Sequence, residues 1–528
     1  MYKATKTDAS CSSGPSSTSI KRQTTITAAL QSGSKQVTDA ALARAFYANG
    51  IPFSIIENKY FKEAIAAVAK AGPGYKPPGR QAISEALLAN EVANVSCKLD
   101  SFKAQLSTTG GTLVSDGWTN VQNRAIINFL LVTGDGAMFV DGVDTSGQIK
   151  DADFIATELA KRIDSIGSDN IVQVVTDSAG NCVAARNKLA VKYTSIAFSP
   201  CTAHCLDLLL EDIGKLCWAR DIIIRGHEVV KFITNHQSPL DYFRSKSKLE
   251  LLKPGETRFA SNFVMMQRLM ATKDAIQETV MDRGFKQWLS KTTRKKSIRD
   301  NGKLITDTVV DGSFWDSVTL LTSVCEPIVS LLRLVDGAKP CVGKIYWKMF
   351  QLDQGVLNST MLDAAQKSCL SGLINSRWKM LHTDLHSAGF VLDPEYRSFL
   401  QHENEEVISG FHAMIERVHA GDLAAQVNAI SQHSVYRAGQ GLFARPVAMA
   451  AANEMSASRW WQAFGAHVPE LQKVAIRVLS QVTSASACER NWSTFDFIHS
   501  KKRNRLKCDK VQILLLFLGT VCCSCTIN

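Results

Sequence analysis

Hydrophobic positions recur with two different periods along the chain, and the shorter period marks a strand-rich segment in the first half. Residues 112–116 (TLVSD) are a short apolar run, and residues 124–143 hold two strand-like runs around Gly-Asp-Gly, the pattern of a β-hairpin. Buried strands are also predicted at 170–177 (NIVQVVTD) and 194–198 (TSIAF), and helical patterns alternate with them. The order β-β-β-α-β-α-β-α predicts a five-stranded mixed sheet with helices on both faces.

Helical periodicity dominates the rest of the chain, so we expect an α/β plus all-α protein in five parts. Residues 1–36 are rich in Ser and Thr without an apolar period, which is typical of a disordered leader. Residues 37–106 are predicted to form a small helical unit, and residues 107–217 hold the sheet. Residues 218–480 form a long helical section, and residues 481–528 are helical again.

The positive charge of the chain is concentrated in two segments. Residues 286–303 carry seven Lys/Arg and one Asp, a net charge of +6, and residues 501–510 carry six Lys/Arg and one Asp, a net charge of +5. Together they equal the net charge of +11 of the whole chain. Such concentration favours a polyanionic partner, nucleic acid before an anionic membrane, although two solvated loops would have the same composition.

The cysteines and the N-terminus indicate a cytosolic or nuclear protein. The 14 cysteines are scattered, and the first residues lack the apolar region of a signal peptide. We find no uninterrupted apolar stretch of the roughly 18 residues that a membrane span requires, so no membrane partner is expected.

Two aspartates end two of the predicted strands: Asp116 in LVSD and Asp177 in VVTD. If these strands are parallel neighbours, both carboxylates emerge at the same edge of the sheet. Two carboxylates at close range repel each other unless a cation lies between them, and oxygen ligands suit Mg²⁺ or Mn²⁺. A pair of such ions about 3.5–4 Å apart promotes phosphoryl transfer. Alternatively, each aspartate only caps the turn or helix that follows it.

Four stretches together resemble the hAT superfamily of DNA transposases: LVSDGWTNVQNRAIINFLLV, VVTDSAGNCVAARNKLA, CTAHCLDLLLEDI and SACERNWSTFDFIHSKKRNRL. The resemblance covers roughly residues 40–518, and all four motifs occur in the family's order. It implies a ribonuclease-H-like five-stranded sheet interrupted by a large helical insertion, followed by a helical C-terminal dimerisation segment.

The resemblance implies an acidic triad of Asp116, Asp177 and Glu489, which holds Mg²⁺ or Mn²⁺ for DNA strand cleavage and transfer. We expect the two aspartate carboxylates to lie within about 4–7 Å of each other, and Glu489 within about 4–8 Å of both. The helix that carries Glu489 should pack beside the first strand and bury Trp492 and Phe495. Without the resemblance, Glu489 reads as a carboxylate at a helix N-terminus.

The family's C-x-x-H signature matches Cys201 and His204. Structural zinc needs four ligands, and Cys205 and Cys182 would both be needed to complete them, so core packing or polar contact with DNA is the favoured interpretation. Arg258 and Phe259 match a motif whose aromatic ring can stack on a base. The basic residues expected along the DNA phosphates are Lys501, Lys502, Arg503 and Arg505.

The remaining expectations concern partners. The pair Trp460–Trp461 resembles the start of the family's dimerisation segment, although plain helix packing also explains it. The N-terminus holds Cys11 and no His before His204, so no Cys/His zinc finger is expected there. We therefore expect a nuclear protein that binds DNA and forms a homodimer or higher oligomer. A catalytically silent DNA-binding descendant, or a helical scaffold with a vestigial sheet, are the alternatives.

Overall fold

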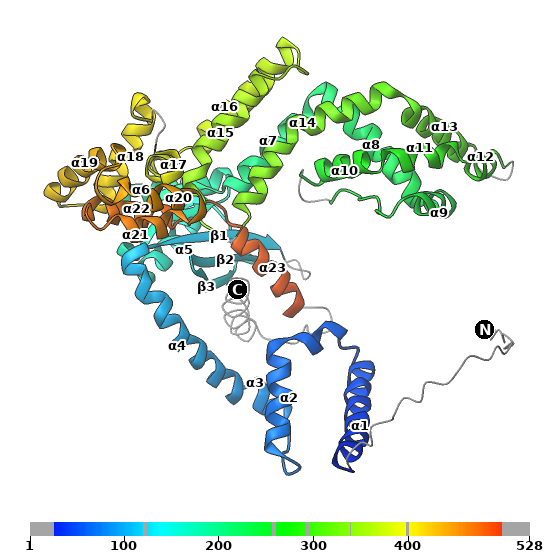
Figure 1. Ribbon diagram of the computed structural model, residues 1–528, viewed down its shortest axis with the longest axis horizontal. Coiled ribbons are helices and arrows are strands. Elements are labelled where there is room, and N and C mark those ends of the chain that lie inside the picture. Colours follow the sequence, from blue (N-terminus) through cyan, green and yellow to red (C-terminus); the bar gives the residue numbers. More distant parts are fainter. Residues whose placement is uncertain are drawn as a thin grey trace, which may run out of the picture. The chain divides into compact units, whose positions relative to one another are not determined.

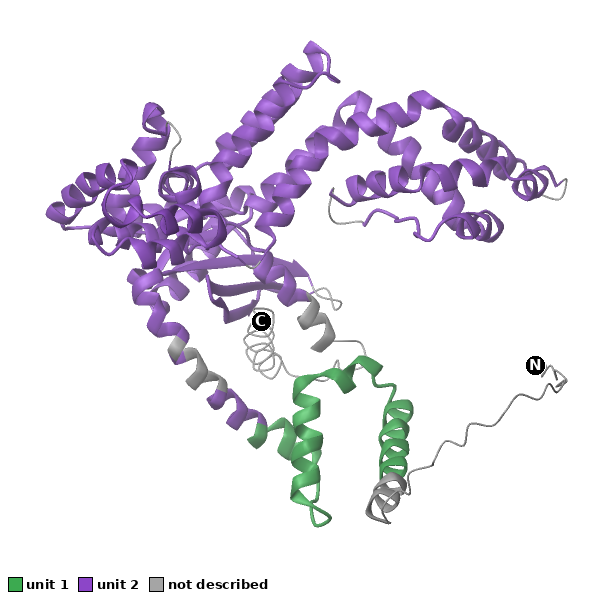
Figure 2. Cartoon of the chain, in the orientation of Figure 1, with its two compact units in different colours: residues 1–87 green, residues 88–528 purple. Residues whose placement is uncertain are grey.

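The structure is a computed structural model that describes residues 26–119, 124–255, 260–291, 295–337, 339–397 and 401–498 (Figure 1). The chain divides into two compact units, residues 1–87 and 88–528 (Figure 2). Unit 1 contains α1 (Ile26–Asn49), η1 (Phe53–Glu57), α2 (Lys59–Ala71) and α3 (Arg80–Ser84), and the division falls in the first turn of α4 (Ala86–Thr109).

Helix α1 begins inside the segment that its Ser/Thr-rich composition predicted to be a leader. Its second half, from residue 37 on, lies in the segment whose pattern predicted helix, whereas its first half lies in the Ser/Thr-rich segment. Unit 1 buries few side chains: on α1, Phe46 is buried and Tyr47 is more than two-thirds exposed, and η1, α2 and α3 have no buried residue.

Unit 2 contains one five-stranded mixed sheet in the order β3-β2-β1-β4-β5. Strand β1 pairs antiparallel with β2 and parallel with β4, so the predicted neighbourhood of the first and fourth strands is confirmed. The β2–β3 hairpin turns at Gly-Asp-Gly, as the pattern indicated. The strands are β1 (Gly111–Thr119), β2 (Ala125–Thr133), β3 (Gly136–Asp144), β4 (Ile171–Thr176) and β5 (Ala197–Pro200).

Both faces of the sheet are covered because side chains alternate along each strand. Leu113 packs in one core with α5 and α6, and Val114 packs in another with α7 and with α23 (Ser486–Ile498). The predicted helices on both faces are thereby confirmed. The helices next to the strands are α5 (Ala152–Ile166), η2 (Ser168–Asn170), α6 (Gly180–Lys192) and α7 (Thr202–Lys215).

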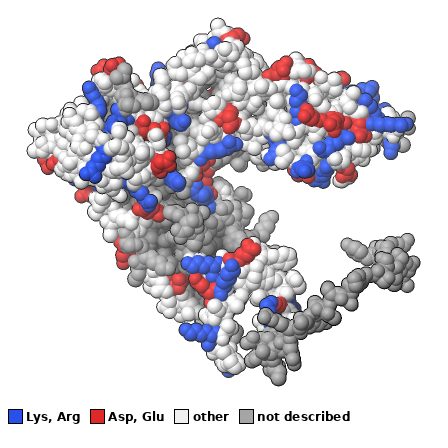
Figure 3. All heavy atoms as spheres, viewed as in Figure 1, with Lys and Arg blue, Asp and Glu red and all other residues white. Residues whose placement is uncertain are grey.

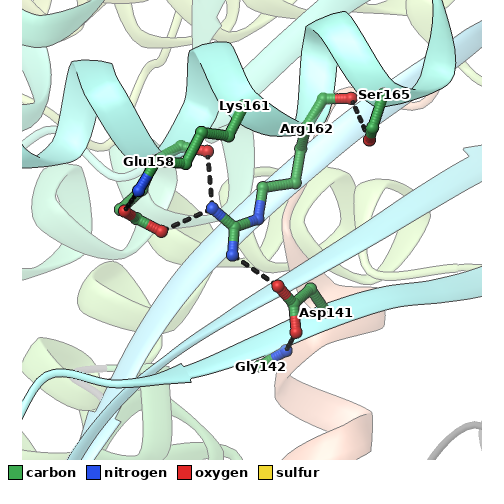
Figure 4. A network of polar contacts seen from close by, with 6 residues as sticks. All are labelled: Asp141, Gly142, Glu158, Lys161, Arg162 and Ser165. Carbon is green, nitrogen blue, oxygen red and sulfur yellow. Dashed lines mark hydrogen bonds and ion pairs between the residues drawn. The ribbon is translucent and has the colours of Figure 1, made fainter.

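A buried ionic network fixes α5 across β3 (Figure 4). The guanidinium of Arg162 donates to Glu158 on its own helix and to Asp141 on β3. Lys161 donates to the other oxygen of Glu158 at 2.6 Å. The Arg162 guanidinium also lies 4.7 Å from the centre of the Phe129 ring on β2. One arginine therefore links α5 to two strands.

Between β5 and α23, the described residues form helices and no strand, which agrees with the predicted all-helical section. Its first half, α8 to α16, packs with α7 in the same core as Val114. Its second half packs in a separate core around Trp460 and Trp461. These helices are α8 (Cys217–Asn235), α9 (Gln237–Lys246), α10 (Ala260–Ala271), α11 (Lys273–Met281), α12 (Arg283–Ser290), α13 (Lys296–Val310), α14 (Gly312–Val335), α15 (Val342–Leu357), α16 (Ala364–Leu381), α17 (Asp384–Leu392), η3 (Pro394–Tyr396), η4 (Gln401–Glu403), α18 (Glu405–Val418), α19 (Leu423–Arg437), η5 (Gly441–Ala444), α20 (Pro446–Glu454), α21 (Ala457–Phe464) and α22 (Pro469–Leu479).

Helix α14 is, in the described part of the chain, the one helix long and apolar enough to cross a membrane. The sequence prediction did not single it out, because charged residues interrupt its apolar run. Its side chains Phe314, Trp315, Val318 and Leu321 are buried, which identifies it as a core helix of unit 2.

The chain returns to the sheet at α23 (Ser486–Ile498), which packs on β1 and β2. The segment before it is also anchored at the sheet: Thr112 Oγ1 donates to Gln481 Oε1 at 2.8 Å, and Gln481 Nε2 donates to the carbonyl of Thr109 at 3.0 Å. The predicted return of a helix starting near Ser486 to the first strand is confirmed.

Candidate functional site

The two strand-end aspartates lie at the same edge of the sheet. Val114 on β1 pairs with Val175 on β4, and each aspartate comes two residues after its valine. Adjacent strands lie about 4.8 Å apart, so the backbones of Asp116 and Asp177 are close neighbours. Both residues are half-buried. The structure therefore brings the two aspartates together, while the expected distance between their carboxylates stays a prediction.

The Asp177 side chain lies at the start of α6. Its Oδ1 accepts a hydrogen bond from the backbone N–H of Ala179 at 3.0 Å, so Asp177 caps the turn that precedes α6. Nearby, burial and then the charge of Asp177 raise the pKa of Cys182 to about 12, which keeps that thiol neutral.

Arg186 fixes the end of β4 from inside the fold. Its Nη1 donates at 2.6 Å both to Thr176 Oγ1 and to the carbonyl oxygen of Asp177. Arg186 is buried, and burial lowers its pKa, although the neighbouring Cys182 and Asp177 act in the opposite direction. A buried guanidinium on the backbone of Asp177 holds this carboxylate's position relative to the sheet.

Asp116 is held by the helix that returns to the sheet. The indole Nε1 of Trp492 on α23 donates to Asp116 Oδ2 at 2.8 Å. The Trp492 ring also stacks on Trp118 of β1, with ring centres 5.2 Å apart. Trp492 is buried, as predicted, but its hydrogen bond to Asp116 was not anticipated.

Glu489 lies in the first turn of α23, one turn before Trp492 and on the same side of the helix. Cys488, the residue before it, donates from Sγ to the carbonyls of Val114 and Asn128 at 3.7 and 3.9 Å. Helix α23 thus follows β1 toward Asp116. The structure thus brings Glu489 to the strand that bears Asp116. In the sequence, Glu489 lies 312 positions after Asp177 (489 − 177). The distance from the Glu489 carboxylate to the aspartates stays a prediction.

A buried asparagine adjoins Asp116. Asn128 on β2 is directly opposite Asp116, and strand alternation directs both side chains to the face covered by α23. Asn128 is 2% exposed, and neither side-chain polar atom has a partner among the described residues. The amide of Asn491 on α23 is buried and equally without a partner there. An unpaired buried amide is costly, so the position of Asn128 opposite Asp116 is typical of a site that receives a polar ligand.

The two residues of the C-x-x-H motif lie in different environments, Cys201 in the core and His204 at the surface. Cys201 is buried, and its Sγ accepts a hydrogen bond from the backbone N–H of Ala485 at 3.3 Å. The backbone N–H of Thr202 donates to the carbonyl of Thr483 at 2.9 Å, so the motif joins α7 to the returning chain. Burial is the main cause that raises the pKa of Cys201 to about 11. His204 is exposed in the first turn of α7.

Metal binding can be assessed from the donors present. Asp116, Asp177, Glu489 and Asn128 offer hard oxygen atoms, which Mg²⁺ and Mn²⁺ prefer, and the orphaned Asn128 amide fits such a ligand. Within the described ranges, however, no three His, Cys, Asp or Glu side chains lie close enough together to hold an ion as they stand.

The residues expected to contact DNA lie outside the described residues. They are Arg258, Phe259, Lys501, Lys502, Arg503 and Arg505, and the side chain of Phe495 is not described either.

Sequence reasoning missed Arg186 and Asn128, for different reasons. Arg186 comes four residues after Cys182 and three before Leu189, so it shares their side of α6, the side that faces the core. This helical spacing was the available signal for Arg186. Asn128 interrupts an otherwise apolar strand, AIINFLLVT, and that single polar residue was the available signal.

Two family models match the chain. One is described as a domain of unknown function (DUF659) and matches residues 78–238, which contain all five strands. The other is described as the hAT family C-terminal dimerisation region and matches residues 441–517, which contain α20 to α23 and Glu489. No curated protein sequence matches the chain.

Proposed function

Because the chain belongs to the hAT family of transposase-like proteins, we propose that it binds DNA in the nucleus and cleaves and transfers DNA strands through Asp116, Asp177 and Glu489. One observation carries the proposal: α23 packs on β1 and donates a hydrogen bond from Trp492 to Asp116, one turn after Glu489. In this view the five-stranded sheet is a ribonuclease-H-like core, which the strand order supports.

Each side chain of the site has a distinct part in this proposal. Asp116, Asp177 and Glu489 would hold Mg²⁺ or Mn²⁺, which supplies charge stabilisation to phosphoryl transfer when bound. Trp492 orients Asp116, and Arg186 fixes the backbone of Asp177. Buried Cys488 lies beneath Asp116, and burial raises its pKa well above the usual value, so no thiolate competes there.

Plasmid cleavage tests the proposal. We expect the full chain to nick or linearise plasmid DNA with Mn²⁺, and Asp177→Asn and Glu489→Gln to abolish cleavage while DNA affinity changes little, because phosphate contacts supply the affinity. Glu454→Gln, a charge removal at an exposed residue of α20, is the matched control and should cleave like the parent chain. Undiminished cleavage by Glu489→Gln would remove this residue from the triad.

A second candidate is a catalytically silent DNA-binding descendant. The observation that favours it is that α23 is attached to the sheet by structural contacts, such as the bond from Ala485 to Cys201, which a non-catalytic fold would also need. In that case the parent chain binds DNA but leaves plasmid intact in Mg²⁺ and in Mn²⁺.

We also propose that the protein forms a homodimer or higher oligomer through its C-terminal helices. The dimerisation-region match begins at residue 441, four positions after α19 ends. On α19, Leu423, Val427 and Ile430 follow one another at i, i+4 and i+7 and are exposed. On α20, Val447 and Met449 are exposed as well. Trp460 and Trp461 are buried within the same chain and support the fold of this region.

A further inference from the structure

A basic hairpin is formed by α12 and α13. Between residues 283 and 303, the described part of the chain holds seven Lys or Arg residues and one acidic residue, Asp300. Figure 3 shows Lys and Arg side chains gathered where these two helices lie. We call the set the basic tip: Arg283, Lys286, Lys291, Lys295, Lys296, Arg299 and Lys303.

The basic tip has a rigid support. Phe285 and Trp288 of α12 are buried against Phe232 of α8, with ring centres 6.5 and 6.2 Å from it. Helix α13 approaches closely at Gly302, where an added Cβ would come within 2.3 Å of Leu289 Cδ1. Both helices therefore bury their apolar side and leave their cations outside.

The cations of the basic tip have no acidic partner among the described residues. Elsewhere in the same group of helices, cations do pair: Arg225 with Asp311 at 3.0 Å, and Lys246 with Asp282 at 3.1 Å. Six of the seven cations in the basic tip are exposed, and Arg299 is half-buried. Unpaired cations this close together repel one another, so the hairpin carries a charge that the fold itself does not neutralise.

The spacing suits a nucleic-acid backbone. Lys296, Arg299 and Lys303 follow one another at i, i+3 and i+7 along one side of α13. Seven residues of helix rise about 10 Å, the length of about three base-pair steps. Both described aromatic rings of the hairpin, Phe285 and Trp288, are buried, so the surface offers charge and no ring for base stacking. Such a surface contacts phosphate without reading sequence.

We propose that the basic tip is a second DNA-contacting surface, carried by elements other than the candidate site, which binds the phosphate backbone of duplex DNA. The proposal rests on the proposed DNA function and adds a part of the chain that the triad does not need. It makes the helical section a clamp on DNA that flanks the site of cleavage.

The salt dependence of DNA binding tests this proposal. The full chain carrying Lys286→Gln, Lys296→Gln and Lys303→Gln is titrated against a short duplex at several salt concentrations. Each lost phosphate contact lowers the slope of log affinity against log salt by about 0.9, so we expect a fall of about 2 to 3. The loss should be equal for two unrelated duplex sequences.

The control carries Lys348→Gln, Lys379→Gln and Lys473→Gln, which remove three exposed lysines of α15, α16 and α22. It should keep the slope of the parent chain, and both variants should keep the parent's melting temperature. An unchanged slope in the tip variant, or an equal fall in the control, overturns the proposal, as does a loss of binding to anionic vesicles without a loss of DNA binding. If the parent chain binds no DNA, the proposed function itself is wrong. If the parent binds DNA and the tip variant has the same salt slope, only the proposal for the basic tip is wrong.

Discussion

Asn128 is a buried residue whose side-chain amide makes no hydrogen bond among the described residues that would stabilise the fold. A buried polar group without a partner costs about 1–3 kcal/mol, and replacement by an apolar residue of similar size removes that cost. Its place opposite Asp116 is at the proposed site, where a bound ligand would satisfy it. A residue that lowers stability at a functional position is a common trade between folding and function.

We therefore expect Asn128→Leu to raise the free energy of unfolding by about 1–2 kcal/mol and to lower metal-dependent DNA cleavage at the same time. Urea unfolding and the plasmid assay measure the two effects. Asn453→Leu at an exposed position of α20 should change neither. A variant that is less stable than the parent would show that the Asn128 amide is satisfied in solution.

Arg162 is the opposite case, a buried charged side chain whose guanidinium donates to two carboxylates. Its guanidinium donates to both Glu158 and Asp141, so Arg162→Ala leaves Asp141 without a cation and Glu158 with only the exposed Lys161. We expect a loss of about 3 kcal/mol in the free energy of unfolding. Lys161→Ala removes the exposed partner of the same glutamate and should cost less than about 1 kcal/mol.

The same network sets a pH dependence. Burial acts to raise the pKa of Glu158, but the hydrogen bonds from Lys161 and Arg162 outweigh it, and the pKa lies below its usual value of 4.5. A lowered pKa stabilises the fold above pH 4.5, and the contribution is lost as the pH falls through the folded-state pKa. Arg162→Ala should flatten this acid limb, and equal acid limbs in parent and variant would contradict the assignment.

At the scale of elements, the strands and their order were predictable because buried strands and a Gly-Asp-Gly turn have strong local signals. The neighbourhood of β1 and β4 followed from the order of elements alone. The docking of α23 on β1 did not, because nothing in residues 486–498 encodes a contact with residues 111–119. Resemblance supplied that connection, and the Trp492–Asp116 bond and the Cys201–Ala485 bond could only be seen once both segments were placed.

The link between the returning chain and the sheet depends on Gln481. This fully buried side chain accepts from Thr112 and donates to the carbonyls of Thr109 and Arg477. Gln481→Leu removes the donor to both carbonyls and leaves Thr112 only its longer bond to Gln173 Oε1 at 3.4 Å, and we expect a loss of about 2–3 kcal/mol in the free energy of unfolding. Gln287→Leu on the exposed side of α12 should stay within about 0.5 kcal/mol of the parent chain. Similar losses for both variants would mean that Gln481 does not anchor the return.

At the scale of the whole molecule, association between copies is the clearest prediction. Val427→Glu places a charge on the exposed apolar side of α19, where burial in a dimer would leave it unpaired. We expect sedimentation velocity to show a shift from dimer or higher oligomer to monomer. Val310→Glu is the matched control, because Val310 is 54% exposed and Val427 58%, and it should not change the assembly. An unaltered oligomer of the Val427 variant would direct attention to α20 or to unit 1.

The late return of α23 also has a consequence for the order in which the protein is made. The face of β1 and β4 that bears Val114 and Val175 is completed by a helix that begins 310 residues after β4 ends (486 − 176). At a synthesis rate of about 5–20 residues per second, the ribosome needs about 15 to 60 s to supply it. During that interval the nascent sheet has one apolar flank without its final cover, and Glu489 does not yet exist as part of the chain. During that interval the nascent chain carries both aspartates of the proposed triad but not yet the glutamate that would complete it.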